Sequence, residues 1–162
     1  MQRNLVEKVN KLRQLVETLY NWYVPPFKIN TIALSENELQ AVISDVYSKS
    51  AYDDWLRLDG AYYTVDLETL KKIIAWDWTD TRKYVSDKFD CDKFALYFKS
   101  RMAIDFGINA IGVVLDYSAG HAYNLVIVKS GGKTNWFLYE PQTDALFRFE
   151  ERDKSVYRME PS

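Results

Sequence analysis

The spacing of apolar residues changes at Gly107, and this change constrains the fold more than any other feature of the chain. Before Gly107 the apolar residues recur every three or four positions, which predicts helices over residues 4–23, 35 to about 47, 66 to about 76, and 91–106. After it the residues alternate, which predicts strands over residues 110–117, 121–129, 134–140 and 145–149. Helices followed by an antiparallel sheet indicate an α+β fold.

The loop Ser130-Gly131-Gly132-Lys133 predicts a hairpin, and a symmetric closure on this loop sets one register, whereas a one-residue slip would put His121 and Glu140 on opposite faces. If Lys129 pairs with Thr134, Tyr123 lies opposite Glu140 and His121 lies opposite Gln142. Alternate residues of a strand share a face, so these four side chains point to the same side of the sheet. Glu140 is then a diagonal neighbour of His121, close enough for its side chain to reach the imidazole.

The first predicted helix carries a heptad seam, defined here as Leu5, Val9, Leu12, Val16 and Leu19 and extended by Tyr23. Pro25-Pro26 ends this helix and forces an extended connection. We expect the seam to pack across the domain's own core. The alternative is a short coiled coil that joins two copies of the chain as a homodimer.

Two further segments lack a regular pattern. Residues 48–64 are aromatic and are expected to be irregular, with a turn at Asp59-Gly60. The tail from Glu150 is highly charged and is expected to be loosely held.

Composition narrows the class of protein. A length of 162 residues predicts one domain over residues 1–162, and a net charge of -2 argues against a nucleic-acid partner. No apolar run approaches the ~20 residues that span a bilayer, and the first residues lack a signal-peptide core. A single cysteine excludes an internal disulfide. We therefore expect a cytoplasmic protein without a membrane partner.

Cys91 and His121 are the sole cysteine and the sole histidine of the chain. Cys91 follows Asp90, a good N-cap residue, and the positive end of a helix favours the thiolate form of cysteine. His121 begins a strand and can act as its base, while Glu140 can hold the imidazole in the required tautomer. The carboxylates of Asp90 and Asp92 oppose a thiolate unless a cation neutralises them.

Three short motifs contain these residues: Asp90-Cys91-Asp92-Lys93-Phe94-Ala95, Gly120-His121-Ala122-Tyr123-Asn124 and Glu140-Pro141-Gln142. Together they resemble the papain-like, calcium-dependent cysteine protease domain that forms the C-terminal half of fungal chimeric lectins of the Marasmius oreades agglutinin type. The resemblance covers about residues 84–142. It implies a papain-like fold, with Cys91 as nucleophile, His121 as base, Glu140 as orienting acid and Gln142 assisting in the site.

The resemblance also suggests calcium, for which Asp87, Asp90 and Asp92 offer hard oxygen ligands. The leading hypothesis is a cysteine hydrolase, a peptidase or amidase, that acts on a peptide or amide substrate through an acyl-thioenzyme. Two alternatives stay open. One is a transglutaminase-like or acyltransferase-like enzyme on the same scaffold, and the other is a papain-like fold kept as a binding or assembly module without catalysis.

Overall fold

The computed structural model describes residues 2–49, 57–117, 119–148 and 157–160. These residues form four helices: α1 (Gln2–Tyr23), α2 (Glu36–Lys49), α3 (Leu67–Trp76) and α4 (Cys91–Phe106). They also form seven strands: β1 (Ile32–Leu34), β2 (Tyr62–Thr64), β3 (Ile111–Asp116), β4 (His121–Ser130), β5 (Lys133–Glu140), β6 (Ala145–Phe147) and β7 (Tyr157–Glu160). The predicted α+β class is confirmed.

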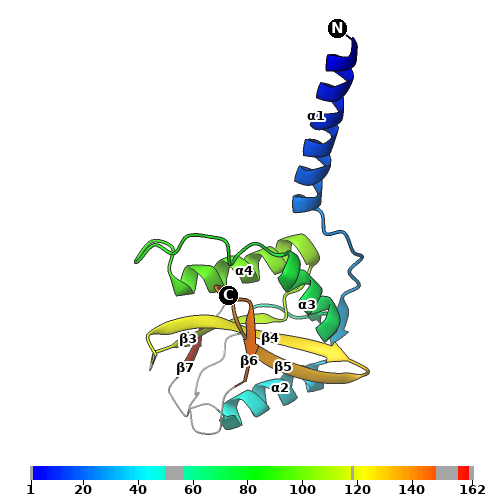
Figure 1. The fold of residues 1–162 in the computed structure, drawn as a ribbon. Coiled ribbons are helices and arrows are strands. Elements are labelled where there is room, and N and C mark those ends of the chain that lie inside the picture. Colours follow the sequence, from blue (N-terminus) through cyan, green and yellow to red (C-terminus); the bar gives the residue numbers. More distant parts are fainter. Residues whose placement is uncertain (1, 50–56, 118, 149–156, 161–162) are drawn as a thin grey trace.

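A five-stranded antiparallel sheet in the order β6-β5-β4-β3-β7 lies at the centre of the fold. Helices α3 and α4 cover one face of this sheet and α2 covers the other (Figure 1). Alternate residues of β4 serve the two faces: Leu125 and Ile127 belong to the apolar cluster with α2, while Val126 and Val128 belong to the cluster with α3 and α4. This two-sided burial explains why β4 reads as one long apolar run.

Local signals set the helix ends. Ser35 and Glu38 form the capping box: the Ser35 N–H donates to Glu38 Oε2 at 2.8 Å, and the Glu38 N–H donates to Ser35 Oγ at 3.3 Å. Asp66 accepts from the Thr69 N–H at 2.8 Å and caps α3. Gly107 ends α4 in the left-handed region, with φ of 67°. Asp90 stands at the N-cap of α4, but its side chain makes no capping hydrogen bond.

The predicted hairpin register is confirmed. Lys129 pairs with Thr134 and Asn124 pairs with Tyr139, so the ladder leads toward Glu140 as the loop predicted. Gly131 and Gly132 adopt φ of 58° and 76°, a conformation that residues with a Cβ rarely take.

The structure adds strands that the sequence pattern did not predict. Within the segment expected to be irregular, β2 pairs with β1 as a separate two-stranded sheet, whereas residues 50–56 lie outside the described residues. In the charged tail, β7 pairs antiparallel with β3, and residues 149–156 lie outside the described residues. The charged composition of the tail does not predict a strand. Backbone pairing with β3 nevertheless orders part of the tail.

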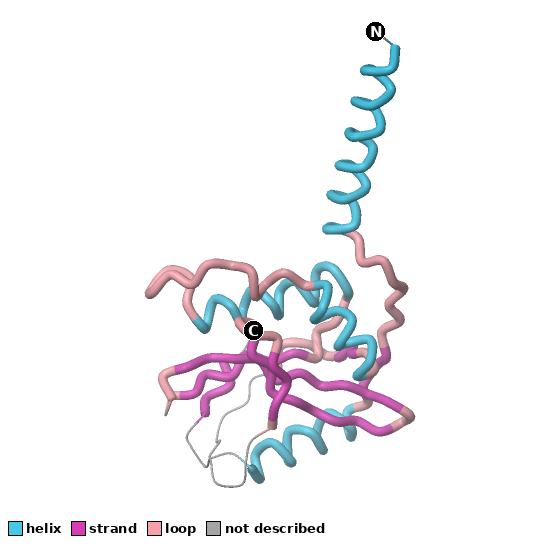
Figure 2. The backbone as a smooth tube through the Cα atoms, in the orientation of Figure 1, coloured by secondary structure: helices cyan, strands magenta, loops and turns pink. Residues whose placement is uncertain are grey.

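Helix α1 extends away from the sheet and from the other helices (Figure 2). Its seam residues are 48% to 65% exposed, so the expectation that they pack on the domain's own core is wrong. The physical reason lies in the connection after Pro25-Pro26, where Phe27 and Ile29 pack against the core cluster in place of α1. Among the described residues, no helix is long and apolar enough to cross a membrane.

Candidate functional site

The structure joins three of the predicted site residues by hydrogen bonds. His121 is the first residue of β4, Glu140 is the last residue of β5, and Gln142 follows in the turn. Nε2 of His121 lies 2.5 Å from Oε2 of Glu140. The other oxygen of Glu140 accepts from the backbone N–H of Gln142 at 3.1 Å and from its side-chain amide at 3.2 Å. Gln142 thus fixes the carboxylate that holds the imidazole.

The charges of this cluster stabilise each other. The hydrogen bond with Glu140 raises the pKa of His121, against the opposing effect of burial. Burial acts to raise the pKa of Glu140, but the hydrogen bonds from His121 and Gln142 outweigh it and hold that pKa below its usual value. The contact therefore favours the charged forms of both groups, an imidazolium paired with a carboxylate.

Aromatic rings continue this cluster across the sheet. The ring centroids of His121 and Tyr123 lie 6.0 Å apart, and those of Tyr123 and Phe147 lie 5.4 Å apart. Tyr123 is buried, while Phe147 is 37% exposed and presents its ring at the surface. The cluster therefore combines polar groups with an accessible aromatic surface.

Cys91 is half-buried at the first residue of α4, and its thiol is free. Among the described residues, no hydrogen bond joins Cys91 to His121, so the structure does not connect the fourth predicted residue to the other three. Lys93 lies 3.3 Å from a carboxylate oxygen of Asp90 and 2.8 Å from one of Asp92. A lysine, then, neutralises the two acids that flank the cysteine.

The predicted calcium ligands do not fit a metal in this arrangement. Because the ammonium group of Lys93 pairs with both Asp90 and Asp92, it occupies the oxygens that a cation would use. In the part of the chain that the structure describes, no group of three or more His, Cys, Asp or Glu residues is arranged to hold a metal ion. Calcium binding stays a prediction from resemblance.

Asn124 serves the opposite face of the sheet from His121, as the register predicts. Its buried side-chain amide donates to the carbonyl of Ala95 in α4 at 2.9 Å and to the carbonyl of Gly112 in β3 at 3.1 Å. This residue fastens α4 to the sheet and is not the partner of the histidine.

A groove of about 380 Å³ lies between α2 and β5, and sequence reasoning missed it. Its lining residues are Glu38, Ala41, Val42, Asp45, Gly132, Thr134, Asn135, Trp136 and Arg148. Two features of the sequence could have indicated this groove. Glu38 and Asp45 are seven residues apart, which places both acids on one face of α2, and Thr134 and Asn135 directly follow the hairpin loop.

The polar groups of the groove are already oriented. Glu38 accepts from Lys129 Nζ at 2.6 Å and from Thr134 Oγ1 at 3.3 Å. Asp45 accepts from the indole N–H of Trp136 at 2.7 Å, and the guanidinium of Arg148 lies 5.1 Å from the Trp136 ring. Since these contacts fix the side chains, the groove presents acceptors and donors at set positions.

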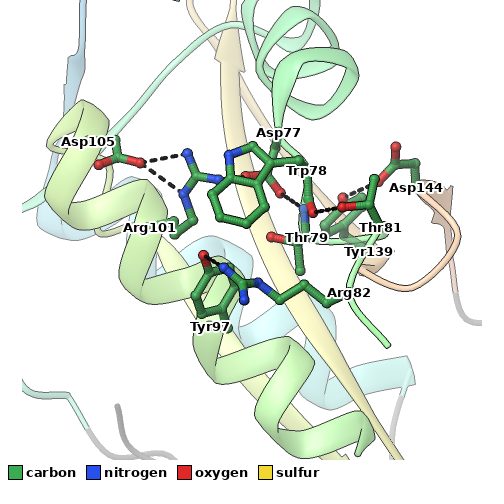
Figure 3. Close-up of polar contacts among 10 residues, drawn as sticks. All are labelled: Asp77, Trp78, Thr79, Thr81, Arg82, Tyr97, Arg101, Asp105, Tyr139 and Asp144. Carbon is green, nitrogen blue, oxygen red and sulfur yellow. Dashed lines mark hydrogen bonds and ion pairs between the residues drawn. The ribbon is translucent and has the colours of Figure 1, made fainter. Parts of the chain in front are cut away.

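Figure 3 shows a second polar cluster that the sequence did not predict. Arg101 of α4 lies 2.9 Å from the carboxylate of Asp77, just after α3, and 2.9 Å from that of Asp105. The guanidinium of Arg82 lies 4.4 Å from the Trp78 ring and 4.3 Å from the Tyr97 ring. These contacts hold the segment between α3 and α4 against α4, so this cluster is structural.

Comparison with known proteins decides the family. The family model for the ricin-type beta-trefoil lectin C-terminal domain matches residues 15–157, which is most of the chain. The chain belongs to this lectin C-terminal domain family. No curated protein matches it.

Two solved structures share the fold of this lectin C-terminal domain. Polyporus squamosus lectin, bound to the human-type influenza-binding epitope Neu5Aca2-6Galb1-4GlcNAc, is 23% identical with a TM-score of 0.55, over 70% of this chain and 44% of that chain. A PSL1a–E64 complex is 21% identical with a TM-score of 0.57, over 77% of this chain and 49% of that chain. The chain thus spans less than half the length of either neighbour, and at these identities the likeness concerns the fold.

The family match corrects the interpretation of function. The resemblance to the C-terminal domain of fungal lectins is confirmed, but the assignment as a hydrolase, a cysteine or thiol protease of peptidase or amidase type, is wrong. The matching family is that of a lectin C-terminal domain, and one of the two neighbouring structures is a lectin bound to a carbohydrate epitope. The Polyporus squamosus lectin is bound to a carbohydrate epitope, so this neighbour does not support the expected peptide or amide substrate. The neighbours do not show that the fold is papain-like.

Proposed function

We propose that this chain is a carbohydrate-binding module and that the groove between α2 and β5 takes the saccharide. The observation that carries the proposal is the match to a lectin domain family over residues 15–157. Of the hypotheses from the sequence, this proposal follows the binding module without catalysis and not the hydrolase.

The chemistry of the groove suits a hydroxylated ligand. Each sugar hydroxyl both donates and accepts hydrogen bonds, so its site needs acceptors and donors side by side. Glu38 and Asp45 supply carboxylate acceptors, while Asn135 and Arg148 supply exposed donors at the rim. A volume of about 380 Å³ lies within the range of small-molecule sites, which runs from about 300 to 1,000 Å³.

We further propose that the scaffold is a papain-like fold used for binding. Its support is the order of elements, with Cys91 at the start of α4 and the hydrogen-bonded pair of His121 and Glu140 at the ends of β4 and β5. In this proposal Glu140 and Gln142 hold the edge of the sheet next to the exposed ring of Phe147.

A glycan array followed by calorimetric titration tests the proposal. The array includes Neu5Acα2-6Galβ1-4GlcNAc, the epitope bound by the Polyporus squamosus lectin. We expect the chain to bind at least one saccharide, and we expect N135A and R148A to weaken that binding by at least about tenfold, which is about 1.4 kcal/mol. Both side chains are exposed, so their loss should leave the fold intact.

Lys71→Ala is the matched control, because Lys71 is also exposed but lies on α3, away from the groove. It should bind the saccharide like the wild-type chain. A folded wild-type chain that binds no glycan would overturn the proposal. Cleavage of a peptide by the wild-type chain, lost in Cys91→Ala, would overturn it equally.

A further inference from the structure

Helix α1 presents an uncovered apolar stripe. Eight large apolar residues of this helix are 48% to 65% exposed: Leu5, Val6, Val9, Leu12, Leu15, Val16, Leu19 and Tyr20. Amphipathic helices of folded proteins bury such a stripe, and most of the stability of a helix in a protein comes from the packing of its apolar face. The stripe therefore needs a surface to cover it.

The residues of the seam indicate what covers it. In heptad notation Val9 and Val16 occupy a positions, and Leu5, Leu12 and Leu19 occupy d positions. β-branched residues at a with leucine at d favour two parallel strands over trimers or tetramers. No charged residue stands at an a or d position between residues 5 and 19. An identical helix is the surface that fits this pattern best.

Size and charge predict a dimer of modest strength. A helix of 22 residues is about 33 Å long, and its stripe offers eight apolar residues, fewer than the roughly 20–30 residues per side of a standard interface. In a parallel pair Lys8 at g faces Arg13 at e of the other helix, which costs free energy. Glu17, 3.6 Å from Arg13 in the same helix, reduces that repulsion.

We propose that α1 binds α1 of a second copy of this chain as a parallel, two-stranded coiled coil. The pair forms and dissociates in the micromolar range, as expected for an interface of this size. The inference does not depend on what the rest of the chain binds.

Sedimentation equilibrium of the full chain, at concentrations from about 1 μM to about 1 mM, tests the proposal. The average mass should rise toward twice the monomer mass across this range. L12D places a charge in the seam and should leave a folded monomer at all concentrations, because Leu12 does not contribute to the domain's core. N10D adds the same charge two residues before Leu12, at a b position outside the seam, and this variant should dimerise like the wild type. A wild-type monomer throughout, or a dimer unaffected by L12D, would overturn the proposal.

Cysteine cross-linking tests the orientation, in a C91S background that leaves no other thiol. Leu5→Cys alone should form a disulfide-linked dimer under mild oxidation, because equivalent d positions meet in a parallel pair. Cross-linking only in a mixture of L5C with V16C, a d position and an a position, would mean an antiparallel pair and would overturn the proposed arrangement.

Discussion

His121 and Glu140 contact each other through Nε2 and Oε2 at 2.5 Å, across the ends of two neighbouring strands. The contact is part-buried, with the histidine side chain 34% exposed and the glutamate side chain 15% exposed. Because His121 is the sole histidine of the chain, its titration reports on this contact without ambiguity.

The first prediction concerns that titration. The hydrogen bond with Glu140 raises the pKa of His121 above 6.5. An NMR titration of the wild type should therefore give a His121 midpoint above pH 6.5, and Glu140→Gln should lower this midpoint. Because the pKa of His121 is raised on folding, its contribution to the free energy of unfolding is fully present below its unfolded pKa. This contribution is lost as the pH rises through its folded pKa. For Glu140, with a lowered pKa, the contribution is present above its unfolded pKa of about 4.5 and is lost in acid.

The pair should thus contribute most between about pH 4.5 and pH 6.5, where both charges are present. Urea unfolding of the wild type and of Glu140→Gln across this range measures the difference. A wild-type midpoint for His121 at or below 6.5 would contradict the assigned contact.

A second prediction concerns Glu38 at the rim of the groove. Hydrogen bonds from Lys129 and Ser35 lower the pKa of Glu38 to about 2. The stability that this glutamate adds is present above its unfolded pKa of 4.5 and is lost as pH falls toward 2. Between these two values the wild type should lose more stability than Glu38→Gln, as measured by urea unfolding. Parallel losses in the two proteins would refute the prediction.

A third prediction concerns the buried ion pair. The side chains of Asp77 and Arg101 are 1% and 12% exposed, so Arg101→Ala leaves a buried carboxylate without its countercharge. Breaking such a pair costs about 3–5 kcal/mol of unfolding free energy, measured with denaturant. Asp105→Ala, which removes the more exposed partner of Arg101, should cost at most about 1 kcal/mol. Equal effects of the two substitutions would show that Asp77 is not the main partner.

A fourth prediction concerns Asn124. Its amide donates to carbonyls of α4 and β3, and Asn124→Ala should lower the unfolding free energy by about 1–3 kcal/mol because buried hydrogen bonds are lost. The midpoint of the His121 titration should stay unchanged, since Asn124 faces away from the histidine. Asn135→Ala, at an exposed amide, is the control for stability. A shifted histidine midpoint in Asn124→Ala would argue against the observed register.

Local sequence signals predicted most of the central fold. The Gly131-Gly132 loop set the register, and this register correctly placed Glu140 beside His121. The capping box at Ser35 and the stop at Gly107 marked helix ends to within a few residues. These signals work because each depends on residues close together in the chain.

Features that depend on distant residues were not predictable in this way. Strands β1 and β2 have three residues each, too few to show a period, and their paired residues Leu34 and Tyr62 are separated by 27 intervening positions. A heptad seam has the same pattern whether the domain's own core or another chain covers it, so the position of α1 could not be read from it. Likewise, a cysteine, a histidine and an acid in a given order do not determine function, because a scaffold can keep them while its role differs.

The docking of Phe27 and Ile29 onto the core leaves little free chain between α1 and the body of the domain. Only residues 24–26 remain as a tether, at most about 10 Å of extended chain, and two of the three are prolines. If two chains pair through α1, such a stiff tether holds their two bodies at a nearly constant separation. Retention on a glycan-coated surface should then depend on the spacing of the glycans, because a short tether gives a high effective concentration only at matching distances.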